Sequence, residues 1–134
     1  MDFNKKKEIR KEMDVEGKRL VNSFKYAGCG IITALKAEKN MKIHFLAVLV
    51  VIILGFVLHI SCAEWIACII LFGGVIGAEM LNTAIEAVVD MITPQKNPKA
   101  KIAKDVAAGA VLIWAICATT IAIIIFAPKI INLF

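Results

Sequence analysis

The chain has 134 residues, of which 60% are apolar, and it carries a formal net charge of +5. That length allows one domain, and the apolar fraction is too high for a soluble domain of this size. Because the basic residues flank apolar segments, anionic lipid is their nearest partner, which argues against nucleic-acid binding. The four cysteines have neither metal-type nor redox-type spacing, so we assign them no chemistry. The composition therefore predicts a single-domain integral membrane protein.

The N-terminal part of the chain is polar and then becomes amphipathic. Residues 1–14 mix charges of both signs with few apolar residues, which is typical of a solvated or disordered tail. From residue 15 to residue 36, apolar residues recur every three or four positions and basic residues occupy other faces. This pattern predicts an amphipathic helix in the membrane interface, although packing on other helices is compatible with it. Gly28 and Gly30 interrupt the pattern and are places where the helix can bend.

Two apolar stretches in the middle of the chain are long enough to cross a membrane, which takes about 20 helical residues. The first, residues 43–63, contains no Lys, Arg, Asp or Glu. A short turn around residues 59–64 leads to the second, residues 65–92. Within the second span, Gly73 and Gly77 form a small-xxx-small pair. Such a pair predicts a close contact with another helix.

The C-terminal third of the chain holds a polar loop and a third span. Residues 93–104 contain two prolines and four lysines, which predicts a helix break and a loop. Residues 106–127 are uncharged and predict a span that ends before Pro128. We therefore expect one membrane domain over residues 15–134, built from an interfacial helix and three transmembrane helices.

The basic residues predict how this bundle is oriented. Eleven of the 16 Lys and Arg residues precede the first span, four lie in the 93–104 loop, and none lies in the 59–64 turn. Since cytoplasmic loops are enriched in Lys and Arg, the N-terminus and the lysine-rich loop are expected in the cytoplasm. Three spans then place the C-terminus outside.

A polar face interrupts the second span near its C-terminal end. At about 100° per residue, an arc of about 80° on one helix face collects four polar residues: Glu79, Asn82, Glu86 and Asp90. Carboxylates are costly near hydrocarbon, so three in line indicate a site that faces the protein interior or water. About 21 Å of apolar helix precede Glu79, which places it just inside the cytoplasmic edge of the hydrocarbon. An amphipathic helix with a solvated polar face explains the spacing equally well.

Polar residues from several predicted elements meet at this cytoplasmic edge: Glu38, Glu79, Asn82, Glu86, Asp90, Lys104 and Asp105. Such a set suits a metal–nucleotide site, because Mg²⁺ usually takes one or two carboxylates together with substrate phosphates. Phosphoryl transfer also requires charge stabilisation and one group that orients or deprotonates the attacking hydroxyl. The depth argument selects Glu79 for that last role.

These residues carry a resemblance to a known family. The pattern Glu-x-x-Asn-x-x-x-Glu-x-x-x-Asp, followed fourteen residues later by Lys-Asp, resembles the signature of the small bacterial membrane diacylglycerol and undecaprenol kinases. The run LNTAIEAVVD at residues 81–90 is its most specific part. The resemblance extends from about Arg19 through the third span. It implies a homotrimer in the bacterial cell membrane, with active sites between subunits that transfer the ATP γ-phosphate to a lipid alcohol.

The resemblance also implies roles for individual residues. Glu79 matches the general base, and Asn82 supports the base and the phosphate. Glu38 and Glu86 match ligands of Mg²⁺. The residues expected at the bound nucleotide are Arg19, Tyr26, Glu38, Glu86, Asp90, Lys104 and Asp105.

The acceptor and the class of function have alternatives. The NMKIH stretch with His44, and VAAGAVL after Lys-Asp, resemble the undecaprenol kinase branch, so undecaprenol is the expected acceptor and diacylglycerol the alternative. The apolar start of the third span, residues 106–112, also suits an isoprenoid chain better than ester carbonyls. A small transporter is the competing class, since intramembrane carboxylates often mark ion paths. Spans one and three carry no charge at mid-depth, which favours the kinase.

Overall fold

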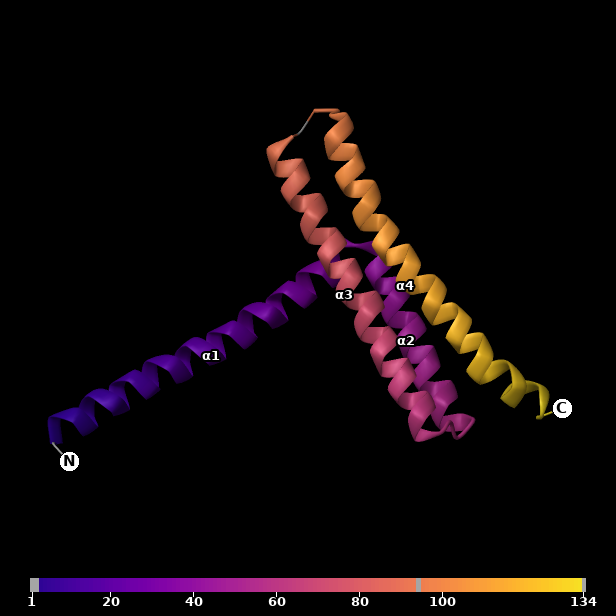
Figure 1. The fold of residues 1–134 in the computed structure, drawn as a ribbon, viewed down its shortest axis with the longest axis horizontal. Helices are drawn as coiled ribbons and strands as arrows, with labels where there is room; N and C mark the ends of the chain where they lie inside the picture. The colour runs from indigo at the N-terminus through magenta and orange to yellow at the C-terminus, as the bar shows by residue number, and fades with distance from the viewer. Residues whose placement is uncertain (1–2, 94, 134) are drawn as a thin grey trace.

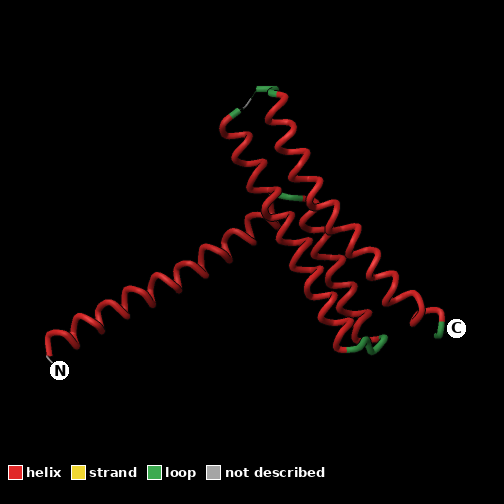
Figure 2. Tube along the Cα trace, viewed as in Figure 1, coloured by secondary structure: helices red, strands yellow, loops and turns green. Residues whose placement is uncertain are grey.

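The protein consists of four α-helices, seen here in a computed structural model that describes residues 3–93 and 95–133 (Figures 1 and 2). The helices are α1 (Phe3–Ala37), α2 (Lys39–Val57), α3 (Cys62–Ile92) and α4 (Pro98–Ile131). The last three pack side by side, and each has the length and apolar composition to cross a membrane. The described residues contain no β-strand. The predicted all-α fold with three spans is confirmed.

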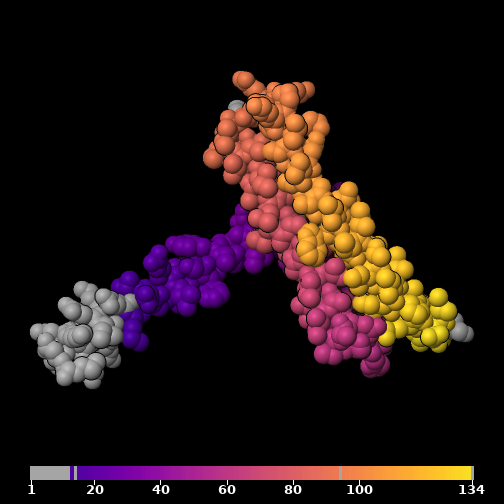
Figure 3. All heavy atoms as spheres, in the orientation of Figure 1, coloured from indigo at the N-terminus to yellow at the C-terminus, as the bar shows by residue number. Residues whose placement is uncertain are grey.

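The first helix stands apart from the other three. α1 runs crosswise to the bundle and departs from it near the start of α2 (Figures 1 and 3). It is continuous through Gly28 and Gly30, and residues 3–14 are helical, so disorder is not seen there, whereas a solvated tail stays a prediction. Residues 1 and 2 lie outside the described part. The location of α1 in the membrane interface stays a prediction.

The turn between α2 and α3 is earlier than predicted. α2 ends at Val57, and α3 begins at Cys62, so Glu64 belongs to the first turn of a helix and not to the connection. The cause is a capping box: the Ser61 hydroxyl accepts from the Glu64 amide at 3.3 Å, and the Glu64 carboxylate accepts from the Ser61 amide at 2.6 Å. This reciprocal pair satisfies amides that a helix N-terminus leaves free. His59 takes a positive φ of 49° in the turn.

The connection between α3 and α4 is shorter than predicted. α3 ends at Ile92 as expected, but α4 already begins at Pro98, so the lysine-rich segment is mostly helical. The Asn97 side chain accepts from the Lys99 amide at 2.9 Å, and a proline in the first turn loses no helical hydrogen bond. At its other end α4 continues through Pro128 to Ile131, past the predicted stop. Pro94 lies outside the described residues.

A close contact between α3 and α4 holds the centre of the bundle. The α3 backbone at Gly74 lies against the ring of Trp114, and a Cβ added there would come within 2.2 Å of the indole. A Cβ at Gly73 or Gly77 would meet no described atom within 4 Å. Within one chain, the close helix contact predicted at Gly73 and Gly77 is therefore made by Gly74 instead.

Much of the apolar surface of the spans is uncovered within one chain. A small buried cluster near the α2–α3 turn contains Ile60, Cys68, Ile125 and Phe126. Elsewhere large apolar side chains on all three spans are exposed, for example Leu49, Ile69 and Ile124. Such faces suit contact with lipid chains, which are as apolar as the side chains themselves.

Candidate active site

The predicted catalytic residues lie where α1 meets α2 against α3. Glu38 occupies the junction between α1 and α2, as the residue that precedes the first turn of α2. The hairpin made by the end of α3 and the start of α4 extends past this junction (Figure 1). Polar residues on that hairpin are therefore exposed beyond the level at which α2 begins.

Glu79 and Asn82 are the two buried polar side chains among the described residues, with 1% and 7% of their surface exposed. Glu79 Oε1 and Asn82 Oδ1 have no hydrogen-bond partner in the described part of the chain. The amide nitrogen of Asn82 donates to Glu86 Oε1 at 3.4 Å, which directs Oδ1 away from Glu86. A buried polar atom without a partner costs about 1–3 kcal/mol, so this pair is suited to bind a ligand.

Both side chains open into a small pocket between three helices. The pocket has a volume of about 300 Å³, and α2 contributes Asn40 and His44 to its lining. α4 contributes an apolar wall that includes Val111 and Ala115. The buried carboxylate thus faces a pocket whose polar residues come from α2 and α3 and whose lining on α4 is apolar.

Other ionisable groups converge on Glu79. His44, Glu38 and Glu86 lie near enough for their charges to act on the Glu79 carboxyl. The structure thus brings together three of the carboxylates that the sequence separates over 48 positions, from Glu38 to Glu86. His44 was not among the predicted site residues. Its signal was its position just inside the first span, where a polar residue is costly unless it has a role.

The donor set fits Mg²⁺ bound together with nucleotide phosphates. Among the described residues, no group of three or more His, Cys, Asp or Glu side chains is arranged to hold a metal ion alone. Mg²⁺ does not need such a cage, since it usually takes one or two carboxylates and completes its shell with water and phosphate oxygens. Glu86, which accepts from Asn82 on α3, and Glu38, just before the first turn of α2, carry hard oxygen atoms of that kind.

A second polar cluster lies farther along the hairpin, about 16 Å from Glu79 along the α3 axis. Lys104 donates to both carboxylate oxygens of Asp90, at 2.8 and 3.0 Å, which joins α4 to α3. Lys101 pairs with Asp105 one turn apart on α4. These residues line a hollow of about 840 Å³ beside the α3–α4 loop. Three of the predicted nucleotide contacts are therefore brought together here.

Two predicted nucleotide contacts remain apart from both clusters within one chain. Arg19 is exposed on α1 and lines a shallow hollow formed by residues 13–23 of that helix alone. Tyr26, also on α1, has 71% of its surface exposed. Their distance from the bundle follows from the direction in which α1 leaves it (Figure 1).

Comparison with known proteins identifies the family. The family model described as prokaryotic diacylglycerol kinase matches residues 25–126, most of the chain. The chain belongs to this family. Membership makes the protein a membrane lipid kinase. The matched range of the prokaryotic diacylglycerol kinase model includes every predicted site residue except Arg19, which precedes it.

Curated relatives within this family carry more than one name. The undecaprenol kinase of Bacillus subtilis is 44% identical over 111 residues, which cover 83% of this chain and 90% of the relative. The diacylglycerol kinase of Synechocystis is 36% identical over 96% of this chain and 74% of the relative. The diacylglycerol kinase of Pseudomonas aeruginosa is 32% identical over 69% of this chain and 76% of the relative. Identity is therefore higher with the relative named for a polyprenol.

Proposed function

We propose that this family member phosphorylates undecaprenol with ATP at the cytoplasmic face of a bacterial cell membrane. The observation that carries the proposal is the buried Glu79 carboxylate, with one oxygen unpartnered, in a pocket whose α4 wall is apolar. The 44% identity to an undecaprenol kinase, over 90% of that relative, supports the choice of acceptor. Diacylglycerol is the second candidate, because the other two relatives are named for it.

In this proposal Glu79 acts as the general base. It removes the proton from the acceptor hydroxyl as the hydroxyl oxygen forms a bond to the γ-phosphorus of ATP, and the bond to ADP breaks. Asn82 orients the phosphate and the base, and its own amide is held by Glu86. Bound Mg²⁺, held by Glu38 and Glu86, would supply positive charge to the phosphate oxygens.

We propose that the nucleotide extends from Glu79 toward the second polar cluster and that a second subunit completes the site. Lys104, with Asp90 and Asp105, would contact the nucleotide there. Within one chain Arg19 and Tyr26 are exposed and apart from Glu79, so they can serve a site only across a subunit boundary or after α1 moves. A homotrimer with active sites between neighbours satisfies the first condition.

The cytoplasmic location of the site can be tested with two native thiols. Cys29 on α1 and Cys62 at the start of α3 are both exposed, and the proposed orientation places them on opposite sides of the membrane. In intact cells Cys62 should react with an impermeant thiol reagent, whereas Cys29 should need a permeant one. Mass spectrometry of the labelled protein distinguishes the two sites. The reverse pattern would invert the proposed topology.

The acceptor is tested by direct competition. Purified protein in mixed micelles receives limiting labelled ATP with Mg²⁺ and equimolar undecaprenol and dioleoylglycerol. We expect label mainly in undecaprenyl phosphate. A clear preference for the glycerolipid would contradict the polyprenol assignment and keep the kinase, whereas label in neither lipid would contradict the catalytic proposal.

A further inference from the structure

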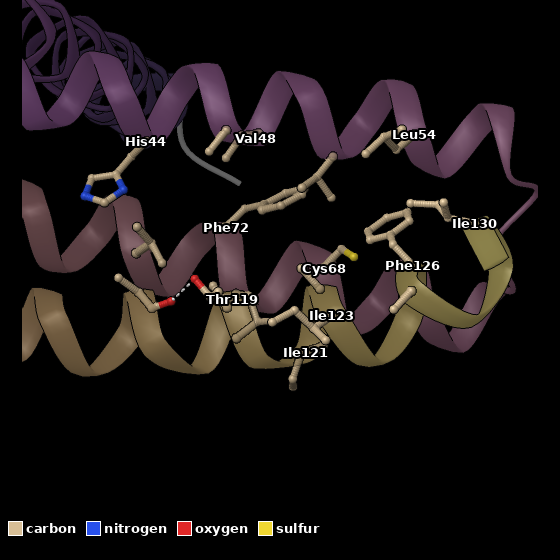
Figure 4. Close-up of a pocket in the computed structure, with 18 residues that line it drawn as sticks. His44, Val48, Leu54, Cys68, Phe72, Thr119, Ile121, Ile123, Phe126 and Ile130 are labelled. Atoms are coloured by element: carbon tan, nitrogen blue, oxygen red, sulfur yellow. Dashed lines mark hydrogen bonds between the residues drawn. The ribbon is translucent and has the colours of Figure 1, made fainter.

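An apolar groove runs along the bundle between α2 and α4, bordered by α3 (Figure 4). It exists because α2 and α4 each pack on α3 and make at most a marginal contact with each other in the described part of the chain. The groove has a volume of about 540 Å³, and its lining on α4 extends from Ala115 to Ile130. That distance is about 22 Å of helix, most of a membrane thickness. Phosphoryl transfer itself makes no use of it.

The groove adjoins the pocket that contains Glu79. Two residues, His44 on α2 and Ala115 on α4, line both spaces. In Figure 4 the His44 imidazole points from α2 toward α3 at one end of the groove, and Ile130 lies at the other. The polar end of a molecule in the groove therefore lies next to the pocket that contains the carboxylate.

The polarity of the groove changes along its length. Its two polar side chains other than the Cys68 thiol are His44 and Thr119, and both lie toward the shared end. The Thr119 hydroxyl already donates to the Ala115 carbonyl at 2.8 Å. The rest of the lining is aliphatic or aromatic, down to Leu54 and Phe126. This gradient matches a molecule with one polar end and a long hydrocarbon chain.

The position of the groove favours a hydrocarbon chain as its occupant. Its polar end adjoins the pocket that contains Glu79, where an acceptor hydroxyl has to arrive, and the rest of its lining is apolar.

We propose that this groove holds the hydrocarbon chain of the lipid alcohol acceptor, with the hydroxyl at the shared end between His44 and Glu79. The inference rests on the proposed function and adds that the protein recognises the hydrocarbon chain of its acceptor inside the bundle. An alcohol with one long chain buries that chain along the whole groove. A glycerolipid can place only one of its two chains there, so a smaller share of its apolar surface contacts the protein.

The test shortens the groove at two depths. Ala118 and Ala122 line it about 4.5 and 10 Å beyond Ala115 along α4. Full-length Ala118→Phe and Ala122→Phe are compared with the wild type in mixed micelles. The acceptors are undecaprenol and geraniol, a short prenol with the same allylic alcohol. Cys117→Phe, at an exposed α4 position of similar depth that lines neither space, is the matched control.

The expected result depends on depth. Ala122→Phe should lower kcat/KM for undecaprenol about tenfold, because the added ring occupies the space proposed for the chain and overpacking of this size is costly, and it should leave geraniol unchanged. Ala118→Phe should lower kcat/KM for both alcohols. Cys117→Phe should match the wild type, and KM for ATP should be constant throughout. Ala122→Leu, a smaller addition, should give a weaker loss of the same kind, and thermal unfolding in detergent checks that each variant folds.

Other outcomes would overturn the inference. Equal losses for both alcohols in Ala122→Phe would mean that the groove serves helix packing or a second subunit. Full activity of Ala122→Phe on undecaprenol would place the chain outside the bundle, in lipid. If the wild type uses only glycerolipids, the proposed acceptor fails. The same variants are then measured with dioleoylglycerol and dihexanoylglycerol, so the groove is tested independently.

Discussion

Two glutamates of α3 lie near the two ends of the part of the bundle that all three spans share, and their carboxylates differ in hydrogen-bond partners. At the α2–α3 turn, Glu64 accepts from the Ser61 amide at 2.6 Å and lies 3.3 Å from Lys129 Nζ. At the other end, Glu79 is 1% exposed, and within the described residues its Oε1 atom has no partner. The Glu64 carboxylate has its partners within the fold, whereas one oxygen of Glu79 has none among the described residues and is available to a ligand.

This difference separates a structural charge from a functional one. A partner-saturated carboxylate at a helix N-terminus stabilises the fold through its cap and the helix dipole. An unpartnered buried oxygen costs about 1–3 kcal/mol, so it persists where a ligand or another subunit offsets that cost. Residue type alone does not distinguish Glu64 from Glu79. Their hydrogen-bond partners do.

The largest effect is expected at Glu79. Glu79→Gln keeps the shape of the side chain but removes its basicity, so kcat should fall by about 10²- to 10⁴-fold. KM for ATP should be nearly constant, because Glu79 is proposed to contact the acceptor hydroxyl. Steady-state kinetics in mixed micelles measure both. Glu64→Gln is the matched control at the other end and should retain its kcat. A loss of ATP affinity in Glu79→Gln as large as that in Glu86→Gln would show that the roles are wrongly assigned.

A smaller and different effect is expected at the proposed metal ligands. Glu86→Gln or Glu38→Gln should raise KM for Mg–ATP about tenfold or more, since an interaction with a charged group contributes about 1.5–3 kcal/mol. Higher Mg²⁺ concentrations should recover part of the activity, and removal of Mg²⁺ with a chelator should abolish it in the wild type. Titration of initial rates with Mg²⁺ measures this. If added Mg²⁺ has no effect on either variant, these carboxylates do not bind the metal.

The packing of α3 on α4 at Gly74 can be disrupted without changing either glutamate. In Gly74→Ala, the new Cβ would lie 2.2 Å from the Trp114 ring and force α3 and α4 apart. Overpacking of this kind costs about 1–3 kcal/mol, so the thermal unfolding temperature in detergent should fall. Gly73→Ala, where the Cβ meets open space, should be neutral or stabilising, because alanine is the better helix former. Equal destabilisation by both substitutions would contradict the packing described for α3.

The smallest effects are expected around Glu64, whose carboxylate has its partners within the fold. Ser61→Ala removes the helix cap and should lower stability by about 1 kcal/mol. Lys129→Met removes a partly exposed ion pair and should lower stability by less than the loss of the cap, since such pairs contribute little. Neither change should alter kcat, which is measured on the same samples as thermal unfolding. A loss of kcat in Lys129→Met comparable to that in Glu79→Gln would end the distinction between the two carboxylates.

Several boundaries could have been read from the sequence with more weight on helix caps. The Ser-x-x-Glu pattern at residues 61–64 and the Asn-Pro pair at residues 97–98 both mark helix starts. Apolar run length led instead to a first span that was too long and a polar loop that was too long. Run length reports how much chain is buried in lipid, whereas caps report where a helix begins.

The sequence by itself determined the membrane class, the three spans, the polar face of α3 and the resemblance that led to the family. These follow from local properties: apolar run length, helical periodicity and residue spacing. Only the tertiary structure decided that Gly74 and not Gly73 or Gly77 contacts α4, and that His44 lines both the pocket of Glu79 and the groove. Those facts depend on how far each helix is rotated and shifted against its neighbours. Packing of residues distant in the chain sets that rotation, and no local pattern contains it.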